Sequence, residues 1–128
     1  NYRREVTVIL ADMFDAAVAT AVATGLRLER VNFVHEMTQA VATALNETRA
    51  LLARTNEEIE ALQKLRQRIR RQDEGANIFV ERLDTQIADK TARHAGVKRR
   101  LVLLEAAVVE LGNYRSEVEL ISALRSAP

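Results

Sequence analysis

The side chains best suited to chemistry in this sequence are its histidines, serines and carboxylates, and their spacing predicts no reaction. A metal site needs several His, Cys or carboxylate ligands gathered together. His35 and His94 are far apart in the sequence, and no second His follows His35 at a ligand spacing. The three serines lie near the C-terminus, at positions 116, 122 and 126, with no His nearby in sequence to activate them. We therefore expect neither a metal site nor a catalytic nucleophile.

Patterns for phosphate binding and acid–base chemistry are also missing from the sequence. The glycines, at positions 25, 75, 96 and 112, are isolated, so no glycine-rich loop is present to cradle a phosphate. Carboxylate pairs such as Glu57-Glu58 fall on a charged helix face, where solvation is the expected state. We predict that the protein is not an enzyme and uses neither a cofactor nor a small-molecule substrate.

One concentration of charge suits binding rather than catalysis. Residues 61–82 hold six basic and three acidic side chains, a net charge of +3. The residues that we consider as a polyanion-binding set are Lys64, Arg68, Arg70, Arg71 and Arg82. Such a cluster can bind the phosphates of a nucleic acid or the acidic surface of a cytoskeletal filament. The competing interpretation, which we favour, is a solvated helix C-terminus whose cations complement the helix dipole.

The elements that carry these residues are predicted to be helices throughout. A chain of 128 residues suits a single domain, 1–128, and its only proline is Pro128. Aromatic residues make up 4% of the chain, while Ala, Val, Leu, Arg and Glu dominate, which favours helix over sheet. The net charge of +1 selects no class of partner, and the absence of cysteine excludes disulfides and thiolate metal sites.

Neither a membrane span nor a targeting signal is predicted. The most apolar windows carry carboxylates at positions 12, 15, 105 and 110, which argues against a span. No signal peptide is visible, and a chain that begins at Asn1 is expected to be an excised or processed segment. The sequence does not identify the compartment, and we favour an intracellular location, cytoplasmic or nuclear.

A seven-residue repeat holds one phase from Val31 to Val118 and predicts two core columns, most of whose members are apolar. The first column is Val31, Thr38, Leu45, Leu52, Ile59, Arg66, Asp73, Val80, Ile87, His94, Leu101, Val108 and Arg115. The second column is Val34, Val41, Thr48, Thr55, Leu62, Ile69, Ala76, Leu83, Lys90, Val97, Leu104, Leu111 and Val118. The pattern is typical of long helices and of coiled coils.

Two architectures compete for this repeat. In a parallel pair of continuous helices, the charged or titratable column members Arg66, Asp73, Lys90, His94 and Arg115 would each face their own copy, which is costly. In an antiparallel hairpin, facing residues have numbers that sum to 149, and each of these side chains meets a neutral one. A different protein, pairing in parallel, would also neutralise the column charges. We favour the hairpin.

The turn of this hairpin is predicted at residues 73–77. Arg70-Arg71 suits a helix C-terminus, Gly75 suits the left-handed residue after it, and Asn77 suits an N-cap. The predicted arms are 27–72 and 77–125, preceded by an N-terminal helix over about 3–24 that ends near Gly25. The resulting fold class is all-α, a long antiparallel helical hairpin with the N-terminal helix packed at its base.

The base of the hairpin carries more apolar surface than one partner helix can cover. Residues 101–111 are apolar almost all round, and a second stripe of apolar residues runs along the same side of both arms. Two occupants can cover this surface, namely residues 3–24 folded back at Gly25 or a second copy of the chain. The residues that we predict at a protein interface are Met37, Ala44, Leu103, Ala107, Val109 and Tyr114.

These patterns together predict a structural or interaction module. We expect it to mediate subunit assembly, as a homo-oligomer that forms a helical bundle or by docking on helices of other subunits. The alternative function is a coiled-coil arm whose basic tip binds nucleic acid or a filament.

Overall fold

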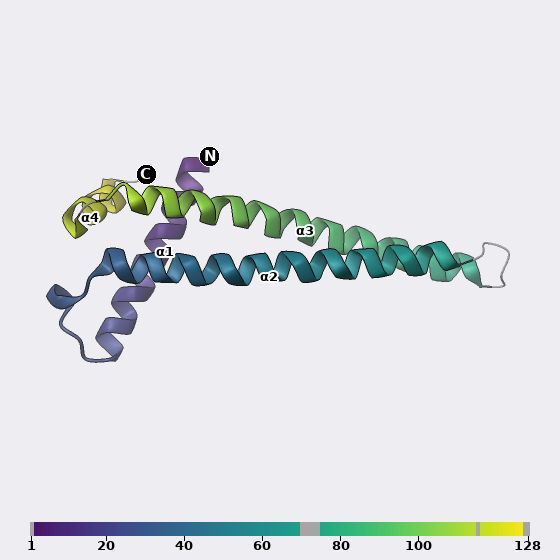
Figure 1. Cartoon of the computed structure of the whole chain (residues 1–128), viewed down its shortest axis with the longest axis horizontal. Helices are drawn as coiled ribbons and strands as arrows, with labels where there is room; N and C mark the ends of the chain where they lie inside the picture. The colour runs from purple at the N-terminus through teal and green to yellow at the C-terminus, as the bar shows by residue number, and fades with distance from the viewer. Residues whose placement is uncertain (1, 70–74, 115, 127–128) are drawn as a thin grey trace. The chain divides into compact units, whose positions relative to one another are not determined.

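A computed structural model describes residues 2–69, 75–114 and 116–126, of which residues 117 and 126 are described by their backbone alone. The described chain forms α-helices at Tyr2–Ala23 (α1), Phe33–Arg68 (α2), Ala76–Gly112 (α3) and Glu117–Ser126 (α4), with a short 3₁₀ helix, η1, at Leu28–Arg30 (Figure 1). The described residues contain no strand. The predicted all-α class is confirmed.

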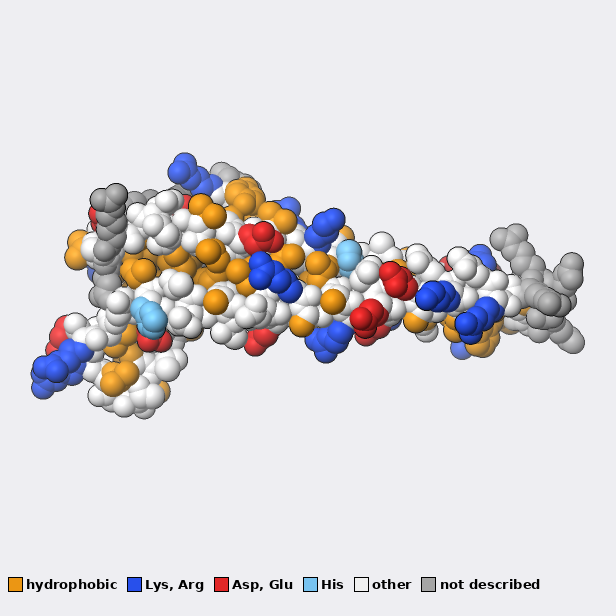
Figure 2. Space-filling model, viewed as in Figure 1, with side chains coloured by type: hydrophobic (Ala, Val, Ile, Leu, Met, Phe, Trp, Pro, Cys, Tyr) orange, Lys and Arg blue, Asp and Glu red, His pale blue; other side chains and the backbone are white. Residues whose placement is uncertain are grey.

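The helices belong to two compact units. Unit 1 comprises residues 1–47 and 101–128, and unit 2 comprises residues 48–100. The long helices α2 and α3 each contribute one segment to either unit. In Figure 2, hydrophobic side chains gather over the unit 1 segments, whereas side chains of both charges are spread over unit 2.

The turn after α1 is built on Gly25, which has a φ of 74°. The Gly25 N–H donates to the Val22 carbonyl at 3.2 Å, and the Leu26 N–H donates to the Ala21 carbonyl at 2.9 Å. These two bonds form a Schellman motif, which satisfies the last carbonyls of the helix. The N-terminal helix therefore ends where the sequence predicts.

The first predicted arm, 27–72, begins later than expected. Helix α2 starts at Phe33, and the segment before it contains η1. The cause is Asn32, whose side-chain Oδ1 accepts a hydrogen bond from the His35 N–H at 3.0 Å and so caps α2. Residues 27–32 are a connection between helices rather than the first turn of the arm.

Helix α3 starts on Gly75 rather than on the predicted cap Asn77. Gly75 has a φ of 77°, as expected for a left-handed residue, and its carbonyl accepts a bond from the Phe79 N–H at 3.4 Å. Asn77 lies inside the first turn of α3, so its prediction as an N-cap is wrong. Residues 73 and 74 of the predicted turn, with Arg70 and Arg71, lie outside the described residues.

The second predicted arm, 77–125, is two helices. Helix α3 ends at Gly112, where the Asn113 and Tyr114 N–H groups bond back to the carbonyls of residues 110 and 111 at 3.0 and 3.2 Å. Helix α4 is capped by the Ser116 hydroxyl, which accepts from the Glu119 N–H at 3.3 Å. The break changes the helix phase, and Val118, predicted in a core column, is 74% exposed.

The core of unit 1 joins α1 and α4 to segments of α2 and α3, and Figure 1 shows α1 crossing these segments obliquely. Its buried members are Val6, Leu10, Met37, Val41, Leu45, Leu104, Ala107, Leu111 and Leu120. The ring centroids of Phe14 and Phe33 lie 5.1 Å apart beside it. Burying a Leu, Met or Val side chain is worth about 1.5–3 kcal/mol, so this cluster accounts for the packing of α1.

Burial in unit 2 follows the seven-residue repeat. Every described residue of unit 2 that is buried or half-buried belongs to one of the two predicted columns. These residues are Thr48, Leu52, Thr55, Ile59, Leu62, Arg66, Ile69, Ala76, Val80, Leu83, Ile87, Lys90, His94 and Val97. Thr55 tolerates burial because its hydroxyl donates to the Leu51 carbonyl at 2.8 Å. All other described side chains of unit 2 are exposed.

Two ion pairs connect α2 and α3 within unit 2. Arg66 Nε lies 2.8 Å from Asp84 Oδ1, and Lys90 Nζ lies 2.5 Å from Glu58 Oε2. Both basic residues are half-buried members of the columns, with their charged ends directed to an exposed carboxylate. Arg and Lys stems commonly cover apolar surface in this way.

Candidate interaction surfaces

Helix α1 covers most of the surface predicted as an interface. Met37 and Ala107 are 0% exposed in the core of unit 1, and Ala44, Leu103 and Tyr114 are half-buried against the same core. Of the two occupants that the sequence left open, α1 therefore fills the place next to these residues. The remaining member of the set, Val109, is 68% exposed.

A smaller apolar strip stays open on α3. Val102 and Val109 are both exposed, and a spacing of seven residues puts them on one face of the helix. Sequence reasoning included Val109 but missed Val102, because residues 101–111 are apolar almost all round and no periodicity marks the outer face. Val108, predicted in a core column, is also exposed.

The predicted polyanion set is brought together only in part. Lys64 and Arg68 on α2 and Arg82 on α3 are exposed, whereas Arg70 and Arg71 lie outside the described residues. Arg66, in the same run, is held by Asp84. Phe79, three residues before Arg82 on α3 and 58% exposed, is the one aromatic residue near these three exposed cations among the described residues. The cations therefore suit contact with phosphates or carboxylates rather than sequence-specific base recognition.

A second basic surface, absent from the sequence predictions, is a shallow groove of unit 2. The residues that line this basic groove are Leu51, Arg54, Thr55, Glu58, Lys90, Arg93, Gly96, Val97 and Arg100. Lys90 lowers the pKa of Glu58 below its ordinary value of 4.5, through a hydrogen bond first and through its charge second. No ion pair holds Arg54, Arg93 or Arg100 among the described residues.

The basic groove was missed because its cations come from two distant segments. Arg54 on α2 and Arg93 on α3 have acidic residues nearby in the sequence, whereas Arg100 on α3 ends the short basic run Lys98-Arg99-Arg100. Counting charged side chains along the chain therefore shows no basic run at Arg54. The heptad register was the one available signal, since it places Leu51 and Arg100 on the same side of the two arms.

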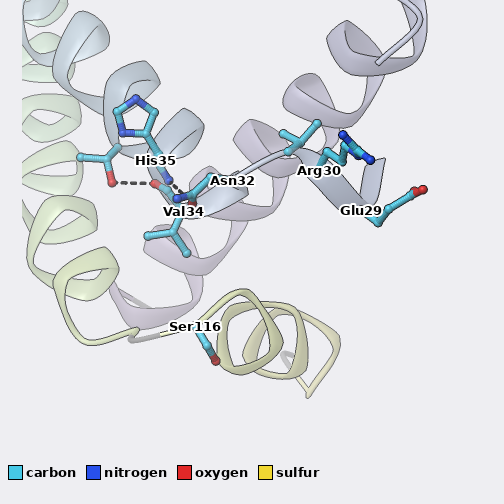
Figure 3. A pocket seen from close by; sticks show the side chains of 8 residues that line it. Glu29, Arg30, Asn32, Val34, His35 and Ser116 are labelled. Carbon is cyan, nitrogen blue, oxygen red and sulfur yellow. Dashed lines mark hydrogen bonds between the residues drawn. The ribbon is translucent and has the colours of Figure 1, made fainter. Parts of the chain in front are cut away.

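A polar pocket of unit 1 gathers His35, Asn32 and Ser116 without assembling a reactive pair (Figure 3). The Asn32 amide caps α2, and the Ser116 hydroxyl caps α4. In Figure 3 the His35 imidazole and the Ser116 hydroxyl do not point toward one another, and Glu29 points away from the pocket. The Asn32 and Ser116 side chains of this pocket therefore act as helix caps.

Tyr114 is the one described side chain with a large pKa shift. Partial burial, first, and the neighbouring Glu110 carboxylate, second, raise the pKa of Tyr114 to about 12. The phenol donates a hydrogen bond to Glu110 Oε1 at 2.9 Å. Among the described residues, no group of three or more His, Cys, Asp or Glu side chains is placed to hold a metal ion.

Helix α1 is long and apolar enough, by length and composition, to cross a membrane. Its inner side chains Val6 and Leu10 belong to the core of unit 1, and its carboxylates Asp12 and Asp15 are exposed. Insertion into a bilayer would separate Val6 and Leu10 from their packing partners and bury two carboxylates, both of which cost free energy.

No family model, curated protein or solved structure matches this chain. Function is therefore inferred from its surfaces.

Proposed function

We propose that the protein is a non-enzymatic structural module, an antiparallel coiled-coil hairpin on a helical base, that mediates subunit assembly. In this proposal unit 2 is the hairpin, closed by the turn at residues 73–77, and unit 1 is the base where α1 packs. The partner is a second copy of the chain or a helix of another subunit. Its binding surfaces are exposed helix faces.

The ion pairs of unit 2 support the antiparallel register. Arg66 is predicted to face Leu83, and its observed partner Asp84 is the next residue along α3. Lys90 is predicted to face Ile59, and its observed partner Glu58 is the residue before it on α2. Contacts that run in opposite directions along two helices are expected of an antiparallel pair.

The observation that carries the assembly function is apolar side chains left exposed on every α-helix. Examples are Val8 on α1, Leu51 and Leu65 on α2, Val109 on α3 and Val118 on α4. Single exposed apolar residues are normal in a monomer. Leu51 and Leu65, however, lie in unit 2, where two helices bury only the two columns, so burial of these two side chains requires a further helix.

Molecular mass measured by light scattering over a range of concentrations tests the assembly function. The chain has a mass of 14.4 kDa, and we expect a species of at least twice that mass to grow with concentration. A mass that stays at one chain up to millimolar concentration contradicts self-assembly.

The second candidate function is polyanion binding near the turn, which the exposed cations Lys64, Arg68 and Arg82 favour. Reversing these three residues to Glu should abolish a gel shift with nucleic acid or co-sedimentation with an acidic filament, and should leave helicity unchanged. The matched control reverses exposed basic residues elsewhere, at positions 4, 27 and 49. Equal binding by the two triple variants rejects this function.

A further inference from the structure

No close contact within the chain explains why residue 96, inside a helix, is a glycine. Gly96 lies inside α3, in the basic groove, and a Cβ built on it meets nothing within 4 Å. Glycine in a helix interior costs about 1 kcal/mol relative to alanine. A residue without a side chain is useful where another backbone approaches closely, so Gly96 points to a helix that docks in the groove.

The charge of the groove restricts what this helix can be. The groove is lined by four basic side chains and one carboxylate, which gives it a net charge of +3. The basic residues are Arg54, Lys90, Arg93 and Arg100, and the carboxylate is Glu58. Lys90 and Glu58 neutralise each other across the helices. A helix that docks here must bring carboxylates to the arginines and small or apolar side chains to Leu51, Val97 and Gly96.

The outer face of α1, defined by Val8, Asp12, Asp15, Ala19 and Val22, has this composition. All five side chains are exposed, and their spacing of three and four residues places them on one side of the helix. Its two carboxylates lie at the centre, between Val8 on one side and Ala19 and Val22 on the other, and the five residues carry a net charge of −2. The exposed Arg4, one turn before Val8 on the same side, adds one positive charge at the end of this face. The opposite side of α1 is already packed in the core of unit 1.

We propose that two copies of the chain associate by docking the outer face of α1 of each copy into the basic groove of the other. This proposal rests on the assembly function above and names its partner and its two surfaces. In the proposed dimer each copy contributes one groove and one outer face, and twofold symmetry makes the two contacts equivalent.

The proposed contact pairs charge with charge and small with small. Asp12 and Asp15 lie one helical turn apart and face the arginines of the groove, while Ala19 lies toward Gly96. Ala19 lies about 6 Å from Asp15 along α1, and Gly96 lies about 4.5–6 Å from Arg93 and from Arg100 along α3. A register with Ala19 over Gly96 therefore sets Asp15 beside one of these two arginines. The charges select the partner, and the apolar residues at both ends of the outer face supply burial.

Reciprocal charge reversal tests the proposal. The groove variant is Arg93→Glu with Arg100→Glu, and the α1 variant is Asp12→Arg with Asp15→Arg. Each alone should weaken dimerisation, measured by sedimentation equilibrium, by about tenfold or more. An equimolar mixture should restore it, because the mixed dimer contains one native contact and one contact with both charges reversed.

Two further variants serve as a control for charge and as a test that changes no charge. Arg49→Glu with Lys98→Glu makes the same change in net charge at exposed positions outside the groove, and should leave the dimer unchanged. Gly96→Leu should preserve the helicity of the single chain and weaken dimerisation about tenfold, because the leucine occupies the place of the docking helix. This variant keeps the test valid if a charge reversal prevents folding.

The outcomes separate this proposal from the assembly function. A wild-type chain that stays monomeric contradicts this proposal and self-assembly, and leaves docking on a helix of another subunit as the form of the assembly function. A dimer that survives the groove, α1 and Gly96→Leu substitutions contradicts docking of α1 in the groove and leaves the assembly function standing. Loss of the dimer without rescue in the mixture also overturns the pairing of these two surfaces. A groove variant that loses nucleic acid binding, with no change of mass, assigns the groove to phosphates instead and rejects the proposal.

Discussion

Replacing Gly96 by alanine should stabilise the single chain. The residue is exposed, lies inside α3 and has open space where the new methyl group would stand. Alanine is favoured over glycine in a helix interior by about 1 kcal/mol, partly because glycine loses more backbone entropy on folding. For a domain of this length, a gain of 1 kcal/mol raises Tm by about 3–5 °C.

Circular dichroism melts and urea titrations of dilute protein, where association is weakest, measure this gain. The matched control is Ala95→Gly, an exposed neighbour on the same helix, which should lose about 1 kcal/mol. If Gly96→Ala destabilises the dilute chain while Ala95→Gly behaves as expected, then Gly96 has a role inside the chain. In that case the glycine is explained without a docked helix.

Three further predictions concern titration and packing. Because the pKa of Glu58 is lowered on folding, its contribution to stability is present above pH 4.5 and lost as pH falls through the folded value. Glu58→Gln should therefore show a smaller loss of unfolding free energy on acidification. Because folding raises the pKa of Tyr114 from 10.0 to about 12, stability should fall as pH rises between these values. Phenolate absorbance of a Tyr2→Phe variant, which keeps Tyr114 as its only tyrosine, measures the shift. Finally, Met37→Ala should cost about 2–5 kcal/mol in urea unfolding, whereas Val109→Ala should change stability by less than about 0.5 kcal/mol.

The interior of unit 2 was predictable because local periodicity decides it. A helix that packs against one other helix buries two columns, and the repeat identifies both without knowledge of the rest of the chain. Polar members such as Thr55 and Lys90 fit this pattern. The Thr55 hydroxyl donates to the Leu51 carbonyl of its own helix, and the Lys90 ammonium donates to the Glu58 carboxylate on the neighbouring helix.

The core of unit 1 was less predictable because several helices meet there. Val108 and Thr38 follow the repeat yet are exposed, while Met37 and Ala107, which lie one residue away from them, are buried against α1. The orientation of a third helix depends on packing between distant segments, and a two-column repeat does not contain that information.

The break between α3 and α4 did have a signal in the sequence. Gly112-Asn113 is typical of a helix C-terminus, and Ser116 followed by Glu119 is the pattern of a capping box. The continuous seven-residue repeat concealed these residues, because Leu111 and Val118 happen to hold its phase across the break.

The distance between two spin labels within one chain tests the hairpin, because the basic groove and the basic cluster near the turn both need α2 and α3 side by side. The chain has no native cysteine, so cysteines introduced at the exposed positions Asn56 and Thr91 take the labels alone. Labelled protein is diluted with unlabelled chain so that pulsed dipolar spectroscopy reports only distances within a chain. We expect about 10–20 Å, since paired helices lie 8–10 Å apart and the label arms add to this. A distance of about 50 Å, the length of one continuous helix over these residues, contradicts the hairpin.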